Sequence, residues 1–207
     1  MSRRLTGLAA ADMPKVDHVC AGCMFWESVE LQEIVCGSTC DPSAQRDWFA
    51  SVHEQWGECG RVALDDGQVL GFIKYAPTGY FPQARHMPTG APDADAALIA
   101  CLHIHDDARS RGLGRLLLQA ALKDLHSRRE RRVYAYALAR KADMRAVPMV
   151  GMEFLLRHGF TVDRPHPHYP LMRLDLRSLA VLGENLEGVL ESLRFPLLRR
   201  LPTPSIE

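Results

Sequence analysis

The residues best suited to chemistry form a glycine- and arginine-rich run, Arg109-Ser110-Arg111-Gly112-Leu113-Gly114-Arg115. The two glycines let a large anion approach the backbone closely, and an amphipathic stretch that predicts a helix follows them. A helix start carries backbone N–H groups without partners and the positive end of the helix dipole. Because three arginines add positive charge at the same point, the run predicts a phosphate or pyrophosphate site.

Two other phosphate-binding patterns fit this run less well. A P-loop requires Gly-x4-Gly-Lys-Ser/Thr, and neither Lys nor Ser follows Gly114. A dinucleotide-binding fold requires a third glycine where this chain has Leu117. The run instead has the pattern Arg-x-x-Gly-x-Gly, which starts at Arg109.

The run lies between a predicted buried strand and a predicted helix. Leu98–Ile104 is mostly apolar and bounded by polar residues, which indicates a strand. After the glycines, one helical face carries the apolar residues Leu117, Ala121, Leu122 and Leu125. Strand, glycine-rich turn and helix together closely resemble the acetyl-CoA loop of the GNAT superfamily of N-acetyltransferases. The resemblance implies an α/β fold with a central mixed, mostly antiparallel sheet, flanking helices and a splayed cofactor strand.

The resemblance also implies that acetyl-CoA binds along this strand and loop as co-substrate. The pantetheine would pair with the strand backbone near its end, and the pyrophosphate would contact the loop. The cofactor-binding residues expected on this basis are Leu102, His103, Ile104, Arg109, Ser110, Arg111, Gly112, Leu113, Gly114 and Arg115.

The acid and base that many GNAT enzymes use are missing from the matching positions. The base is often Glu or His on the cofactor strand, where this chain has Leu98 and Ala100, and the acid is often Tyr where it has Leu155. We therefore expect the base elsewhere, with Asp95 and Glu27 as first candidates. Further candidates are His86, His103, His166, His168 and Tyr169. Two-residue alternation, however, puts His103 on the strand face opposite to Leu98 and Ala100.

These features predict an N-acetyltransferase that moves acetyl from acetyl-CoA to a primary amine. The acceptor could be a small molecule, a protein lysine or a protein N-terminus, and no charged run in the sequence points to one of them. The missing acid and base leave open a second interpretation, a non-catalytic acyl-CoA-binding regulatory module.

Composition sets further bounds on the function. The chain has 207 residues, of which 47% are hydrophobic, and its 25 Lys and Arg balance its 25 Asp and Glu. This balance does not indicate nucleic acid or a membrane surface as partner. The apolar run near the N-terminus is too short for a signal peptide and ends at Asp12, and no run reaches transmembrane length. We expect a cytoplasmic protein with reduced thiols.

The remaining patterns predict the elements around the cofactor loop. They indicate a first strand over Arg3–Ala10, a helix from Asp41 to about Trp56, a hairpin over Arg61–Tyr75 and a helix over Val147–His158, with further strands over Val133–Leu138 and Met172–Leu176. The proline-rich stretch Ala76–Asp95 is either a solvated insertion or, through Tyr80, Phe81 and His86, the wall of a substrate cleft.

We expect two parts in the chain. Residues 1–177 would form the GNAT-like domain, and residues 178–207 a C-terminal helix with a proline-rich tail. The apolar face of that helix would either dock on the domain or form a homodimer.

Four cysteines, Cys20, Cys23, Cys36 and Cys40, have a spacing close to a zinc pattern. The residues between them give no zinc-ribbon hairpin signal, and cysteine commonly serves as a small buried apolar residue. We therefore predict that these cysteines hold no metal. Elemental analysis of protein purified without chelator should find no zinc above background. About one zinc per chain, lost on Cys→Ala substitution, would contradict the prediction.

Overall fold

The structure, a computed structural model, describes residues 3–16, 20–30, 33–34, 37, 39–109, 112–139 and 148–177. These residues form an eight-stranded sheet with the order β1-β2-β3-β4-β5-β8-β7, and β6 pairs with β5 off this path. Neighbouring strands are antiparallel except for the pairs β4–β5 and β5–β6. The predicted mixed, mostly antiparallel sheet with flanking helices is confirmed.

The elements have the following bounds. The strands are β1 (Arg3–Gly7), β2 (Gly60–Asp65), β3 (Gln68–Pro77), β4 (Ala97–Ile104), β5 (Arg132–Leu138), β6 (Val150–Gly151), β7 (Thr161–Arg164) and β8 (Leu171–Asp175). The α-helices are α1 (Pro42–Gln55), α2 (Leu113–Ser127) and α3 (Met152–Arg157). Short 3-10 helices are η1 (Ala10–Lys15), η2 (Thr78–Tyr80), η3 (Pro82–His86) and η4 (Asp106–Ala108).

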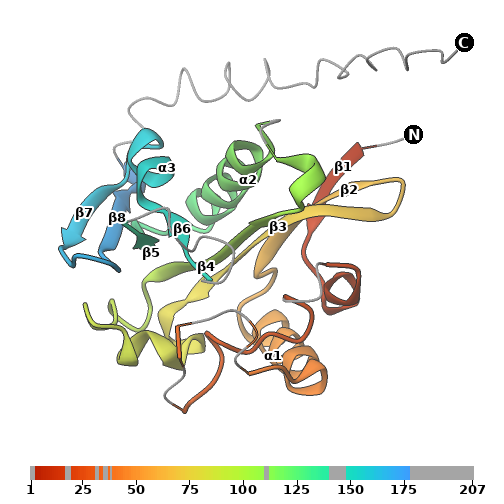
Figure 1. The fold of residues 1–207 in the computed structure, drawn as a ribbon, viewed down its shortest axis with the longest axis horizontal. Helices are drawn as coiled ribbons and strands as arrows, with labels where there is room; N and C mark the ends of the chain where they lie inside the picture. The colour runs from red at the N-terminus through yellow and green to blue at the C-terminus, as the bar shows by residue number, and fades with distance from the viewer. Residues whose placement is uncertain are drawn as a thin grey trace, which may run out of the picture.

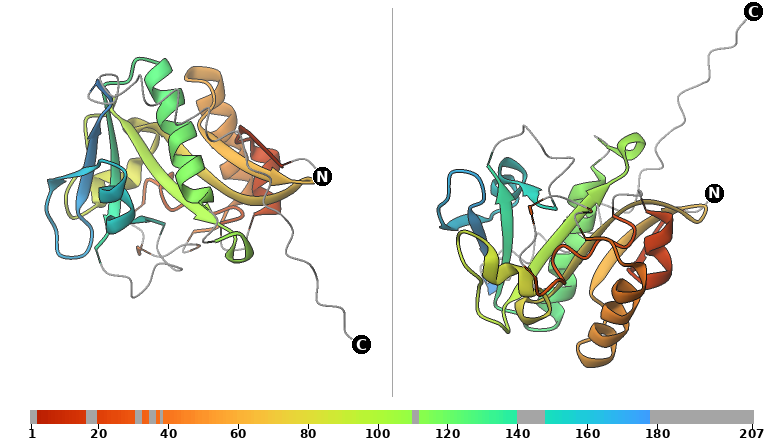
Figure 2. Two further views of the ribbon diagram at one scale, coloured as in Figure 1. Left: turned by 90° about the horizontal axis from the view of Figure 1, so that it is seen from above. Right: turned by 60° about the horizontal axis from the view of Figure 1, so that its bottom comes forward.

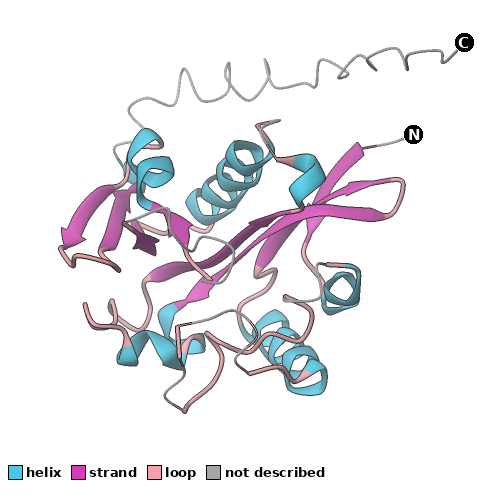
Figure 3. Cartoon of the chain, in the orientation of Figure 1, coloured by secondary structure: helices cyan, strands magenta, loops and turns pink. Residues whose placement is uncertain are grey.

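The sheet separates two apolar cores (Figures 1 and 2). On one face, α1 and η1 cover strand residues such as Phe72 and Leu98. On the other face, α2 and α3 cover residues such as Ile73 and Ile99. Figure 3 shows the magenta strands running between these two groups of cyan helices. No helix in the described ranges is long and apolar enough to cross a membrane.

Local chemistry explains two of the predicted elements. Asp41 caps α1 by accepting hydrogen bonds from the backbone N–H groups of Ser43 (2.9 Å) and Ala44 (3.0 Å). These bonds, the one from Ala44 foremost, lower the pKa of Asp41. The β2–β3 hairpin turns at Asp66 and Gly67, both at positive φ (48° and 84°), as a two-residue turn of the Asp-Gly type requires.

Two predicted elements differ from the structure. The helix expected from Val147 begins only at Met152, because Val150 and Gly151 pair with the end of β5 as β6. The stretch between β3 and β4 is not a solvated insertion, since it forms η2 and η3 and places Phe81 in the core. Phe81 packs against Trp48 with ring centroids 5.4 Å apart.

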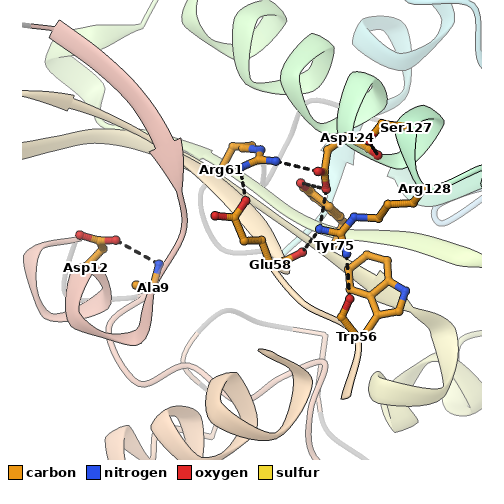
Figure 4. A network of polar contacts seen from close by, with 9 residues as sticks. All are labelled: Ala9, Asp12, Trp56, Glu58, Arg61, Tyr75, Asp124, Ser127 and Arg128. Carbon is orange, nitrogen blue, oxygen red and sulfur yellow. Dashed lines mark hydrogen bonds and ion pairs between the residues drawn. The ribbon is translucent and has the colours of Figure 1, made fainter. Parts of the chain in front are cut away.

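A polar network holds α2 on the sheet (Figure 4). Asp124 of α2 accepts hydrogen bonds from the Tyr75 hydroxyl (2.8 Å) and from Arg61 (2.7 Å), and it forms an ion pair with Arg128 (2.9 Å). Arg128 also donates to the carbonyls of Trp56 (3.0 Å) and Glu58 (2.8 Å). One carboxylate therefore joins β2, β3 and α2, which fixes the direction in which the N-terminus of α2 points.

We predict that Asp124→Ala lowers the free energy of unfolding by about 3 kcal/mol, because it leaves largely buried donors without their shared acceptor. Urea denaturation measures the change. Asp107→Ala is the control, since the Asp107 side chain is 95% exposed and should change stability little. Equal stability of the two variants would show that the network does not hold α2.

Candidate functional site

β4 and β5 separate after their first three residue pairs. The pairing joins Ala97–Ile99 to Val133–Ala135, and no strand of the described residues pairs with the rest of β4 on that side. β4 carries a bulge at the same place. Ile99 lies opposite Tyr75 and Cys101 opposite Lys74, which leaves Ala100 without a partner on β3. A bulge bends its strand, so it turns the end of β4 away from β5 and gives the predicted splayed strand.

The separated end of β4 carries backbone groups that face β5. The His105 N–H donates to the Leu70 carbonyl (2.9 Å), so Ile104 and Gly71 form a non-hydrogen-bonded pair. Alternation then directs the backbone N–H and C=O groups of Leu102 and Ile104 away from β3. The backbone of His103 instead pairs with Phe72 in β3. Of the three strand residues predicted to pair with pantetheine, Leu102 and Ile104 have the required backbone direction.

The loop after β4 leads into the first turn of α2. Gly112 is the N-cap, with a left-handed φ of 75°, and its carbonyl accepts the N–H of Leu116 (3.1 Å). The N–H groups at the start of α2 therefore have no partner within the helix. A Cβ on Gly114 would lie 3.6 Å from the Phe154 ring of α3 and 3.9 Å from Ile104, so Gly114 lies close to α3 and to the end of β4.

The arginines of the loop differ in their surroundings. Arg109 forms an ion pair with Asp106 (2.9 Å) and donates to the Ile104 carbonyl (3.3 Å), which neutralises part of its charge. Arg115 is exposed on α2. Ser110 and Arg111, both predicted to contact the cofactor, lie outside the described residues. In the described part of the loop, backbone N–H groups are the main feature suited to an anion.

A buried ion pair lies on the α1 side of the sheet, where β4 and β5 separate. Lys74 of β3, opposite Cys101 of β4, pairs with Glu27, and their side chains are 4% and 1% exposed. Lys74 also lies 5.4 Å from the centre of the Trp48 ring. Burial by itself lowers the pKa of Lys74, but the Glu27 carboxylate, assisted by Cys101 and Cys23, raises it above its usual value. Lys74 therefore stays an ammonium.

Glu27 has one carboxylate oxygen available for a ligand. Oε1 is bound to Lys74, whereas Oε2 is buried and accepts no hydrogen bond from the described residues. Glu27 was among the residues predicted from the sequence, and Lys74 was not. A lysine inside the apolar run Gly-Phe-Ile-Lys-Tyr-Ala was the available signal, because a charged residue in a buried strand needs a partner.

The bulge also corrects the predicted position of His103. The extra residue shifts the alternation, so Cys101 and His103 lie on the same sheet face as Leu98 and Ala100. The His103 ring packs against Phe72 on this face, with centroids 5.8 Å apart. The prediction that His103 lies on the opposite face was wrong, because regular alternation does not anticipate a bulge.

The structure does not bring Asp95 to this region. Asp95 is exposed just before β4, roughly 15 Å along the chain from Ala100 at strand spacing. It lies near Glu130, whose pKa is raised by burial and by the charge of Asp95. Asp95 is therefore at the closed end of the β4–β5 pair, and Glu27 is at the opening. His86 is exposed on η3.

The histidines of the β7–β8 loop lie at the open end of β5. The Ala139 N–H donates to the His168 carbonyl (2.9 Å). His166 Nδ1 accepts the N–H groups of His168 (3.2 Å) and Tyr169 (3.0 Å), so a neutral His166 carries its proton on Nε2. Tyr169 packs against the core on the Glu27 side. His168 therefore lies beside the end of β5, one of the two strands that separate.

The zinc prediction stays untested. In the part of the chain that the structure describes, no group of three or more His, Cys, Asp or Glu residues could hold a metal. Cys36, one of the four cysteines, lies outside that part.

Comparison with known proteins gives matches to a family and to solved structures. The model of the family described as "Acetyltransferase (GNAT) family" matches residues 24–160, more than half of the chain. Curated proteins give no match by sequence.

Three solved structures illustrate the similarity in fold. PaiA N-acetyltransferase from Thermoplasma acidophilum, in complex with coenzyme A, has 16% identity and a TM-score of 0.51 over 84% of this chain and 99% of that one. An N-acetyltransferase from Staphylococcus aureus Mu50 has 13% identity and a TM-score of 0.57 over 85% and 99%. The ribosomal-protein-S18-alanine N-acetyltransferase from Escherichia coli has 14% identity and a TM-score of 0.51 over 84% and 94%.

We predict that Gly112→Val weakens coenzyme A binding at least about tenfold and more than Arg115→Ala does. A β-branched residue is strained at the left-handed φ of Gly112, and the resulting shift misdirects the N–H groups of the first turn. Hydrogen bonds to a charged group contribute about 1.5–3 kcal/mol each, so the loss of several outweighs one exposed charge. Isothermal titration at low and high salt measures both variants.

Gly67→Val is the matched control, because Gly67 also has a left-handed φ (84°) and open space around it but lies in the β2–β3 turn. It should leave coenzyme A binding unchanged. A larger loss for Arg115→Ala, with a steep salt dependence, would mean that charge rather than backbone geometry governs binding.

Proposed function

The chain belongs to the GNAT family of acetyltransferases, and on that premise we propose that it is an acetyl-CoA-dependent N-acetyltransferase. It would transfer acetyl to a primary amine of a small molecule, a protein lysine or a protein N-terminus. The proposal rests on the edge of β4 beyond Ile99, with which no described strand pairs on the β5 side, and on the first turn of α2 that follows it in the chain.

The described residues fit acetyl-CoA. The N–H and C=O of Leu102 and the N–H of Ile104 would pair with pantetheine amides as a neighbouring strand would, while the Ile104 carbonyl already accepts a hydrogen bond from Arg109. The N–H groups of Leu113 and Gly114 would bind the pyrophosphate at the N-terminus of α2. Among the structural relatives, PaiA is a complex with coenzyme A, which supports this cofactor. His103, Arg109, Arg115, Ser110 and Arg111 remain proposed contacts around the same ligand.

The cofactor supplies the acetyl thioester, and residues of the chain must supply the groups that activate the amine. The amine must lose a proton, and the oxygen of the thioester carbonyl needs a hydrogen-bond donor as charge develops. Glu27 is our proposed base, because its Oε2 is available on the face where the strands separate. With a side chain only 1% exposed, Glu27 would act on an amine that enters the protein, or through a water.

The position of Asp95 at the closed end of the strand pair favours Glu27 over it as the base. His103, His166 and Tyr169 are alternatives on or near the Glu27 side of the sheet. The non-catalytic regulatory interpretation rests on Leu98, Ala100 and Leu155, which are all fully or almost fully buried and cannot exchange protons. The available oxygen of Glu27 speaks against that interpretation.

Two predictions from sequence stay predictions. The C-terminal helix and the homodimer that it would form fall on residues 178–207, which lie outside the described part of the chain. The cytoplasmic location is likewise kept as part of the proposal.

A screen of acetyl-CoA consumption against amines, peptides and aminoglycoside-type antibiotics would identify an acceptor. With that acceptor, we predict that Glu27→Gln lowers kcat at least about tenfold and leaves coenzyme A affinity near normal, since general-base catalysis contributes about 10²–10⁴-fold. Asp95→Asn should retain most of the activity. Normal coenzyme A binding without turnover for any amine would favour the regulatory module instead.

Because Glu27→Gln leaves the Lys74 charge buried without its partner, its folding must be checked. The double variant Glu27→Gln/Lys74→Met removes both charges. Its free energy of unfolding should be close to that of the native protein, and it should stay inactive. Full activity in this double variant would exclude Glu27 as the base.

A further inference from the structure

Cys23 and Cys40 lie directly opposite each other where two segments of the chain run antiparallel. The Met24 N–H donates to the Thr39 carbonyl (2.9 Å), and the Asp41 N–H donates to the Gly22 carbonyl (2.8 Å). These two bonds flank the cysteines, which makes them a non-hydrogen-bonded pair. In such pairs the Cα atoms are about 4.5 Å apart and the side chains project to the same side.

This geometry lies within the range that a disulfide allows. Cα atoms joined through a disulfide are roughly 4.4–6.8 Å apart, a range that includes the usual spacing of a non-hydrogen-bonded pair. Neither cysteine forms a disulfide in the structure. The Cys40 thiol donates to the Ala21 carbonyl (3.2 Å), and Cys23 Sγ accepts the Gly37 N–H (3.5 Å). Both contacts are weak thiol hydrogen bonds that a covalent bond could replace.

Gly22 makes room for the second sulfur. It has a left-handed φ of 75°, and a Cβ at this position would come within 2.9 Å of Cys40 Sγ. The turn between Cys20 and Cys23 thus leaves space next to Cys23 that the sulfur of Cys40 fills. The packing of Cys40 Sγ against Gly22 is an observation separate from the Cys-x2-Cys spacing in the sequence.

The pair is also reachable by small reagents. Cys40 is exposed and Cys23 is half-buried, whereas Cys59 is only 1% exposed. Burial raises the pKa of the Cys59 thiol to about 12, so Cys59 stays protonated and unreactive near neutral pH. Cys59 therefore serves as an internal control for any thiol chemistry at the pair.

We propose that Cys23 and Cys40 form a reversible disulfide, oxidised by a hydroperoxide and reduced by a dithiol. In the oxidation two S–H bonds break and one S–S bond forms. The two electrons and two protons reduce the hydroperoxide to an alcohol and water. Because Cys40 is exposed, a dithiol can reach the bond and reduce it, which makes the disulfide reversible.

The bond would connect the segment that carries Glu27 to the N-cap of α1. Phe25, Trp26 and Glu27 follow Cys23 closely, and Asp41, the N-cap, follows Cys40. Closing this loop restricts the unfolded chain and so stabilises the protein. The proposal concerns the bond alone and stands whatever reaction the protein catalyses.

Peptide mapping of the full chain tests the bond. Trypsin does not cut between Lys15 and Arg46, so all four cysteines of the region share one tryptic peptide, but a glutamyl endopeptidase cuts after Glu27, Glu30 and Glu33. Protein treated with hydrogen peroxide, alkylated and digested with this enzyme should give a linked pair of peptides. Dithiothreitol should separate the pair, and Cys59 should remain a thiol.

The variant Cys20→Ser/Cys36→Ser leaves Cys23 and Cys40 as the remaining cysteines of the region. We expect the link to persist in this variant and to disappear in Cys40→Ser. Oxidation should raise the midpoint of thermal unfolding by roughly 5–10 °C in the native protein and not in Cys40→Ser. Loss of the link in the double variant would overturn the proposal. So would a bond between Cys20 and Cys23 in the native protein, or no bond at all there.

Discussion

The arrangement of the site depends on one constraint, which is that β4 cannot continue its pairing with β5 beyond Ile99. The bulge at Ala100 turns the strand while its other edge stays bonded to β3. Backbone N–H and C=O groups are obligatory hydrogen-bonding groups, and no described strand pairs with β4 at Leu102 and Ile104 on the β5 side. The N–H and C=O of Leu102 and the N–H of Ile104 must therefore bond to water or to a ligand, whereas the Ile104 carbonyl already accepts a hydrogen bond from Arg109. In the binding mode that we propose, a ligand with amide groups at strand-like spacing would satisfy that edge, and the same ligand would reach the start of α2. The network at Asp124 fixes α2 in the direction that this requires.

The second feature of the site is the buried charge pair beneath the point of separation. Removing two charges from water costs several kcal/mol per ion, and their mutual attraction offsets this only with good geometry. The pair of Glu27 and Lys74 is therefore a weak source of stability. Its position beside Cys101, and a Glu27 Oε2 that accepts no hydrogen bond from the described residues, fit the proposed role in handling a polar ligand. The short segment from Cys23 to Glu27 thus carries one cysteine of the pair at its start and the buried carboxylate at its end.

Local chemistry made the strand, turn and helix of the proposed cofactor site predictable from sequence. Glycines at Gly112 and Gly114, an apolar strand before them and an amphipathic helix after them each indicate their structure within a few residues. The turn at Asp66 and Gly67 was predictable for the same reason. The surroundings of Glu27, the proposed base, depend instead on contacts between distant segments. A bulge at Ala100 leaves no mark in the apolar pattern, and the partner of Lys74 lies 47 positions away. A two-residue strand such as β6 is too short for any periodic signal.

Amide hydrogen exchange along β4, resolved by residue with NMR, tests the central claim most directly. The account predicts that saturating coenzyme A slows exchange at Leu102 and Ile104, whose N–H groups face the opening. Exchange at Cys101 and His103 should change little, because their N–H groups are already bonded to β3. Unchanged exchange at Leu102 and Ile104 in the presence of bound coenzyme A would contradict the account.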